Sequence, residues 1–116
     1  MMSIILSVGR DHLLMPLRTM VLHRAGYVVR EAYAGDEALR LLSSGKFDLL
    51  LICHTIPEPE QRELIAAVRR ALPGLPIACM NSNEHPIQEH CSAVDNMAPA
   101  FLTDLSEVLH KTVSSS

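Results

Sequence analysis

Short apolar runs alternate with longer amphipathic segments along this chain. The apolar runs predict strands at residues 3–8, 27–32, 47–53 and 77–80. The run at 47–53 is the clearest, because a central parallel strand that is covered on both faces is apolar throughout. An alternation of this kind is typical of β-α units around a parallel sheet. The pattern therefore predicts an α/β domain.

Between the apolar runs, residues at helical spacing predict three helices. The first follows Gly9 and ends at Gly26, the second has Asp36 as its N-cap, and the third lies between Pro57 and Pro73. The predicted inward-facing residues are Leu13, Leu17, Met20 and Val21 in the first helix, Ala38, Leu39, Leu41 and Leu42 in the second, and Leu64, Ile65, Val68 and Leu72 in the third.

After residue 80 the pattern weakens. A fifth strand is predicted to end near Pro99, and Thr103 is the N-cap predicted for a last helix. Short right-handed crossovers favour a doubly wound, five-stranded parallel sheet in the order 2-1-3-4-5, with helices on both faces in a three-layer sandwich. We predict one domain at residues 1–113, followed by a disordered tail at residues 114–116.

Composition narrows the classes of function. The chain has 116 residues, of which 48% are apolar and 20% charged, and its formal charge is −3. This length fits one domain with a hydrophobic core. Because there is no cluster of Lys or Arg, we expect no nucleic-acid binding, and no uncharged apolar stretch is long enough to span a membrane. Three cysteines without metal-ligand spacing fit a reducing, cytoplasmic location better than a disulfide scaffold.

Ligands of doubly wound sheets bind at the carboxyl ends of the strands, near the point where the strand order reverses. The residues expected to line that crevice are Gly9, Arg10, Cys53, Asn81 and Pro99.

The framework of the chain resembles the receiver domain of bacterial two-component response regulators. Receivers show an apolar first strand, a helix that ends in Ala-Gly-Tyr, a Gly-x-Glu-Ala-Leu helix start, and Asp-Leu-Val-Leu-Leu-Asp with Pro four residues later. The matching stretches here are Ile5-Leu6-Ser7-Val8, Arg24-Ala25-Gly26-Tyr27-Val28-Val29, Ala34-Gly35-Asp36-Glu37-Ala38-Leu39, and Phe47-Asp48-Leu49-Leu50-Leu51-Ile52 with Pro57 four residues beyond Cys53. The resemblance implies a CheY-like, flavodoxin-like fold.

The chemistry of the resembled family depends on residues that this chain lacks. Receivers form an aspartyl phosphate with an acidic pair that holds Mg²⁺, a hydroxyl and a lysine. The acidic pair corresponds here to Gly9 and Arg10, the phosphoacceptor to Cys53, the hydroxyl to Asn81 and the lysine to Pro99. Mg²⁺ requires hard oxygen ligands. We therefore expect a degenerate phosphoacceptor pocket with no bound metal, no cofactor and no catalytic residue.

Two residues of this pocket have more than one interpretation. Arg10 either contacts an anion, in the place of the missing metal's charge, or forms an ordinary salt bridge with Asp11 or is exposed to solvent. Cys53 is either a reactive thiol or, as we favour, a buried packing residue, and we expect Cys79 to be packing as well. A zinc site is disfavoured because Cys53 and His54 are adjacent on a strand and point to opposite faces.

These observations predict a pseudo-receiver: a protein-protein interaction module of bacterial two-component or phosphorelay signalling that is not an enzyme and is not phosphorylated on aspartate. Its partner would be a signalling protein or a histidine kinase-like component, and the prediction also allows a homodimer. Two alternatives are a thiol-based redox sensor that uses Cys53 and a receiver that retains weak phosphate binding through Arg10.

Overall fold

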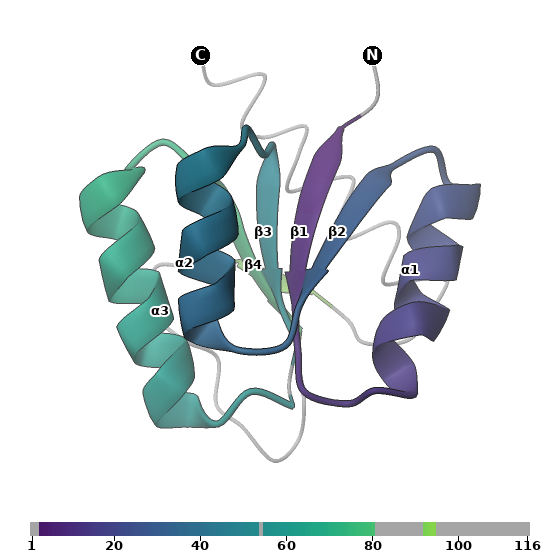
Figure 1. Cartoon of the computed structure of the whole chain (residues 1–116), viewed down its shortest axis with the longest axis horizontal. Coiled ribbons are helices and arrows are strands. Elements are labelled where there is room, and N and C mark those ends of the chain that lie inside the picture. The colour runs from purple at the N-terminus through teal and green to yellow at the C-terminus, as the bar shows by residue number, and fades with distance from the viewer. Residues whose placement is uncertain (1–2, 54, 81–91, 95–116) are drawn as a thin grey trace.

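A computed structural model describes residues 3–53, 55–80 and 92–94 (Figure 1). In chain order the elements are β1 (Ile4–Val8), α1 (Leu14–Arg24), β2 (Val28–Ala32), α2 (Gly35–Ser44), β3 (Leu49–Ile52), α3 (Glu58–Ala71), β4 (Ile77–Met80) and β5 (Ser92–Val94). The described part therefore alternates strands and helices as the hydrophobic pattern predicted.

The strands form one parallel sheet in the order β2-β1-β3-β4-β5. The predicted order of the first four strands, 2-1-3-4, is confirmed. At the far edge, the three residues of β5 pair with β4. The end of the fifth strand was expected near Pro99, which lies outside the described residues, so the extent of that strand stays a prediction.

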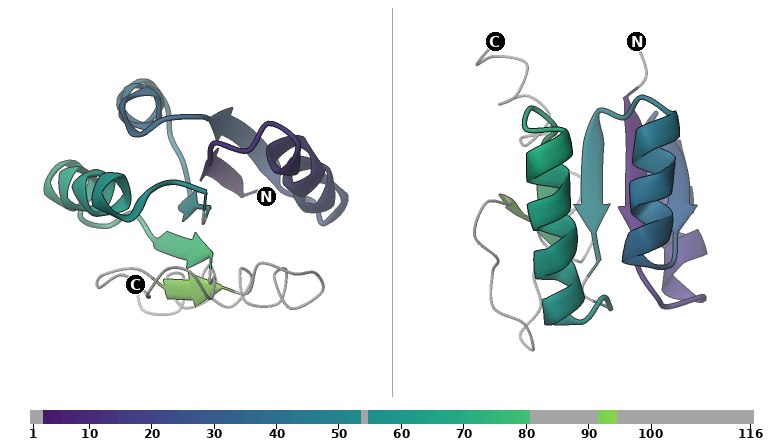
Figure 2. Two further views of the ribbon diagram at one scale, coloured as in Figure 1. Left: turned by 90° about the horizontal axis from the view of Figure 1, so that it is seen from below. Right: turned by 60° about the vertical axis from the view of Figure 1, so that its left-hand side comes forward.

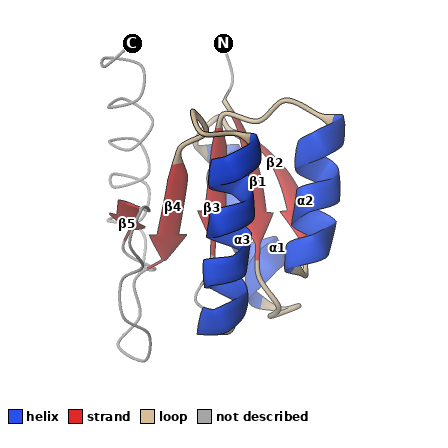
Figure 3. Cartoon of the chain, turned by 90° about the vertical axis from the view of Figure 1, so that its left-hand side faces the viewer, coloured by secondary structure: helices blue, strands red, loops and turns tan. Residues whose placement is uncertain are grey.

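Helices cover both faces of the sheet, with α2 and α3 on one face and α1 on the other (Figures 2 and 3). Alternate side chains of the central strand β3 pack against the helices on opposite faces of the sheet. Leu50 and Ile52 join the core cluster under α2 and α3, whereas Leu49 and Leu51 join the cluster under α1. All four side chains are at most 1% exposed, which is why this strand has no polar position.

Two details of the helices differ from the predictions. Asp36 is not the N-cap of α2, because the helix begins one residue earlier, at Gly35. The Asp36 carboxylate instead accepts a hydrogen bond from the Glu37 N–H inside the first turn. Leu72 is 39% exposed because α3 ends at Ala71, one residue before it. The predicted stop after α1 agrees with Gly26, whose φ of 97° suits a residue without a side chain.

The predicted inner face of α1 was wrong for three of its four residues, whereas Val21 packs against the core cluster under α1. Leu13, Leu17 and Met20 are 80%, 57% and 54% exposed, while Met15 and Leu22 are fully buried. Apolar residues occur on several sides of this helix, so helical spacing alone did not single out the face that packs on the sheet. None of the helices in the described part of the chain is long and apolar enough to cross a membrane.

Candidate functional site

The candidate site lies where β1 and β3 end side by side. The Cys53 N–H donates to the Val8 carbonyl at 2.8 Å, and the Gly9 N–H donates to the Ala32 carbonyl at 3.0 Å. These bonds hold Gly9 and Cys53 at the same edge of the sheet, and Arg10 follows directly. Asn81 and Pro99, the other two residues expected here, lie outside the described residues.

Gly9 lies where an added side chain would meet close neighbours. A Cβ atom added there would lie 2.7 Å from Met15 Sδ, 3.0 Å from Cys53 Cβ and 3.1 Å from Thr55 Oγ1. Atoms essentially never approach a real Cβ as closely as the first of these distances. A carboxylate at this position, which the metal pair of a receiver would require, therefore does not fit without displacing its neighbours.

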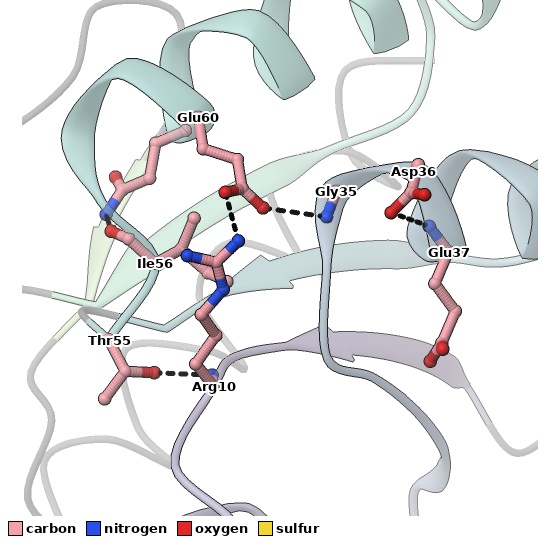
Figure 4. A network of polar contacts seen from close by, with 8 residues as sticks. Arg10, Gly35, Asp36, Glu37, Thr55, Ile56 and Glu60 are labelled. Carbon is pink, nitrogen blue, oxygen red and sulfur yellow. Dashed lines mark hydrogen bonds and ion pairs between the residues drawn. The ribbon is translucent and has the colours of Figure 1, made fainter.

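Arg10 joins three segments at this edge (Figure 4). Its backbone N–H donates to Thr55 Oγ1 at 2.9 Å, and its guanidinium forms an ion pair with Glu60, near the start of α3. The second carboxylate oxygen of Glu60 accepts the Gly35 N–H at 3.0 Å, at the start of α2. We call this Arg10–Glu60–Gly35 arrangement the edge bridge. Arg10 therefore forms its ion pair with Glu60. The partner suggested from the sequence, Asp11, was wrong.

The carboxylate of Asp11, the residue after Arg10, stabilises the start of a helix. Asp11 Oδ1 accepts the backbone N–H groups of Leu13 and Leu14, at 2.8 and 3.0 Å, and so caps the start of α1. His12 stacks on Tyr33 with ring centroids 4.6 Å apart, and His54 lies outside the described residues. Within residues 3–53, 55–80 and 92–94, no group of three His, Cys, Asp or Glu side chains could hold a metal ion.

Cys53 is completely buried beneath α1. Its sulfur lies 3.8 Å from both Ser7 Oγ and Met15 Sδ. Burial raises the pKa of the Cys53 thiol, although the Arg18 guanidinium and the Ser7 hydroxyl act in the opposite direction. The thiol is therefore kept protonated and shielded, which is the environment of a packing cysteine.

Cys79, in β4, does not match the expectation of a simple packing thiol. It is buried in the core cluster under α2 and α3, but it is disulfide-bonded and so is not a free thiol. Disulfides are uncommon in reducing compartments. The cytoplasmic location inferred from the cysteine count therefore stays a prediction.

The raised pKa of Cys53 predicts a pH-dependent contribution to stability. Above the pKa of an exposed thiol, about 8.5, the unfolded chain loses the proton that the folded chain retains. Stability from this group is therefore complete below that pH and falls as the pH rises, by up to about 1.4 kcal/mol per pH unit. We expect urea unfolding between pH 7 and 9.5 to show a steeper loss for the parent than for Cys53→Ala. Parallel curves would contradict the burial of a neutral thiol.

Three residues of the site were not singled out by the sequence. Glu60 occupies the first turn of α3, where acidic residues commonly offset the helix dipole. The sequence therefore did not indicate that its side chain contacts Arg10. Thr55 lies in a loop, and its acceptor role depends on the chain path after β3. Ser7 is a buried polar residue within β1. Only its pairing opposite Leu51 places it beside Cys53.

Comparison with known proteins identifies the fold of the chain. No family model matches the chain, and no curated protein matches its sequence. Among solved structures, it resembles the signal receiver domain of an HD domain-containing protein from Pseudomonas fluorescens, with TM-score 0.85 and 17% identity over 98% of this chain and 99% of that one. It also resembles a CheY-like receiver domain protein from Methanospirillum hungatei, with TM-score 0.83 and 21% identity over the full length of both chains.

A third match is the response regulator protein TrrA from Thermotoga maritima in complex with Mg²⁺ and BeF, with TM-score 0.79 and 22% identity over 96% of this chain and 99% of that one. TrrA is matched again in its complex with the histidine kinase ThkA. At these identities the likeness shows the fold. The described part of the chain has the fold of these receiver domains.

Proposed function

We propose that this chain is a receiver-like module of two-component signalling that binds a protein partner without passing through an aspartyl phosphate. The structural neighbours support the general class, since they are receiver domains and one of them was solved with a histidine kinase. The module we propose has no catalytic residue, and it acts through its surface. Its location in the cytoplasm is part of the same proposal.

The edge bridge is the observation that carries this proposal. The guanidinium of Arg10 and the carboxylate of Glu60 neutralise each other at the edge where the resemblance places a metal pair and a phosphoryl group. A cation bound at this edge would meet Arg10 with like charge. The neighbouring carboxylate of Asp11 is directed to the backbone of α1. Together with the lack of space at Gly9, these contacts disfavour Mg²⁺ binding.

The two alternative functions find less support. A thiol sensor needs a thiolate that an oxidant can reach, whereas Cys53 is fully buried and has a raised pKa. Phosphate binding through Arg10 would have to displace Glu60 from the guanidinium. The interaction module requires neither change, so we favour it.

Treatment with acetyl phosphate and Mg²⁺ tests the proposal. We expect no acid-labile phosphoryl group by intact mass spectrometry, and no saturable NMR shifts of Gly9, Arg10 and Cys53 with Mg²⁺ or with beryllium fluoride. Gly9 offers no ligand, and the carboxylates of Asp11 and Glu60 already bind backbone N–H groups and Arg10. TrrA, which binds Mg²⁺ and BeF, is the positive control. A phosphorylated product, or saturable Mg²⁺ shifts at these residues, would overturn the degeneracy that we propose.

A further inference from the structure

A groove lies between the starts of α2 and α3, on the face of the sheet that these two helices cover (Figure 3). Its volume is about 570 Å³, which lies within the range of known ligand sites, roughly 300–1,000 Å³. The residues that line it come from the first two turns of each helix, from the connections before them, and from the edge bridge. We call it the α2–α3 groove.

Part of the groove surface is apolar and rigid. Pro57 and Pro59 are exposed at the start of α3, and Leu39 of α2 is partly buried. Proline side chains have almost no rotamer freedom to lose, so contact with them costs little conformational entropy. An apolar group of a ligand that is placed against these residues leaves water, which favours binding.

The polar part of the groove is acidic. Among the described residues that line it, Asp36, Glu60 and Glu63 are opposed by one cation, Arg10. Glu60 already pairs with Arg10 and accepts the Gly35 N–H, so the position that suits an anion is filled by a carboxylate of the chain itself. The excess negative charge of the groove therefore comes from Asp36 and Glu63, one on each helix.

The helix dipole does not explain the position of Glu63. Charge–dipole interactions act within the first turn of a helix, whereas Glu63 is the sixth residue of α3. The side chains one turn away on either side offer it no cation, since they are Pro59, Glu60, Ala66 and Ala67. Within the described part of the chain, its exposed carboxylate has no hydrogen bond or ion pair. It is therefore open to a cation from outside.

The rest of the chain has little positive charge with which to cover this groove. All ten Lys and Arg residues except Lys111 lie in the described part. The segments outside it carry more acidic side chains than basic ones, namely Glu84, Glu89, Asp95, Asp104 and Glu107. An acidic groove repels such segments and attracts a partner that carries Lys or Arg.

We propose that the α2–α3 groove binds a short segment of a protein partner that is both basic and apolar. An apolar side chain of that segment would contact Leu39 and the two prolines, and a Lys or Arg on each side of it would face Asp36 and Glu63. The edge bridge stays in place, because the partner's cations meet the two carboxylates that Arg10 does not engage. The inference rests on the proposed interaction function and adds the surface and the chemistry of the partner.

Short capped peptides test this binding with the full chain. The first peptide has Leu between two Arg residues, the second has the same Leu between two Glu residues, and the third has Ser between two Arg residues. We expect the first to cause saturable NMR shifts of Leu39 and Glu63 and to bind about tenfold more tightly than the second, as exposed ion pairs allow. The third should bind more weakly than the first, because it lacks the apolar contact.

A matched pair of substitutions in α3 locates the binding. Glu63→Gln removes one charge from the groove and keeps the size of the side chain, so we expect it to weaken binding of the first peptide about threefold, and about tenfold when combined with Asp36→Asn. Glu58→Gln removes the same charge from the same helix, but Glu58 pairs with Arg62 and does not line the groove. It should leave binding unchanged. None of these side chains is buried, so far-UV circular dichroism should match that of the parent.

Several results would overturn the inference. Equal binding of the Glu peptide would remove the role of charge, and equally tight binding of spermidine would show that the groove takes a small polyamine instead of a peptide. Shifts centred on Phe47 and Leu72 would place binding in the hollow at the opposite ends of α2 and α3. A dimer that Glu63→Gln dissociates would identify a second copy as the occupant. The acetyl phosphate experiment is independent of all these results, so either proposal can fail alone.

Discussion

Gly9→Asp is expected to lower the free energy of unfolding by about 3 kcal/mol. This change restores the first acidic residue of a receiver's metal pair, but the space around Gly9 is filled by Met15, Cys53 and Thr55. The new side chain must push its neighbours aside, and its carboxylate loses solvent without gaining a full set of partners. Urea unfolding followed by circular dichroism measures the loss.

Two control variants separate the effect of added volume at Gly9 from the effect of charge at Arg10. Gly9→Ala adds one carbon and no charge, and we expect it to cost about 1–3 kcal/mol, as overpacking does. Arg10→Ala removes the guanidinium of a side chain that is 47% exposed, so it should cost less than about 1 kcal/mol. If Gly9→Asp were as stable as the parent, the close packing around Gly9 would be refuted.

Leu22→Ala is expected to cost about 2–5 kcal/mol, whereas Leu17→Ala should change stability by less than about 0.5 kcal/mol. Both substitutions remove the same atoms from the same helix. They differ because Leu22 is fully buried in the cluster under α1, while Leu17 is 57% exposed. Denaturant midpoints of the two variants, measured at constant pH, give the comparison directly.

The Leu17 and Leu22 pair also checks the orientation of α1. Equal losses in both variants would mean that Leu17 is buried in solution, either by the sheet or by another part of the chain. A small loss at Leu17 together with a large loss at Leu22 agrees with the orientation described here.

The strands were more predictable than the faces of the helices. β4 was predicted with its observed bounds, and β3 lies within the predicted run 47–53, because a buried parallel strand leaves an unbroken apolar run. In α1, apolar residues lie on nearly every side. Which of them are buried depends on how the Gly9-to-Leu13 connection directs the helix onto the sheet, and that is a tertiary property.

Three of the five residues expected at the site were predicted in position, but their contacts were not. The chain order of the strands indicated that Gly9, Arg10 and Cys53 follow neighbouring strands, and the structure places them at one edge. The partner of Arg10 could not be read in the same way. Glu60 lies 50 residues further along the chain, and its side chain reaches Arg10 only because α3 starts beside α2.

The edge bridge has a consequence for how such a module could be regulated. A ligand or modification shifts a conformational equilibrium only when it interacts differently with two states. In the module that we propose, Arg10 and Glu60 already satisfy each other and link the starts of α2 and α3, so this ion pair would not respond to a kinase. The amount of the module bound to its partner would then follow its concentration, so synthesis and degradation would set the signal.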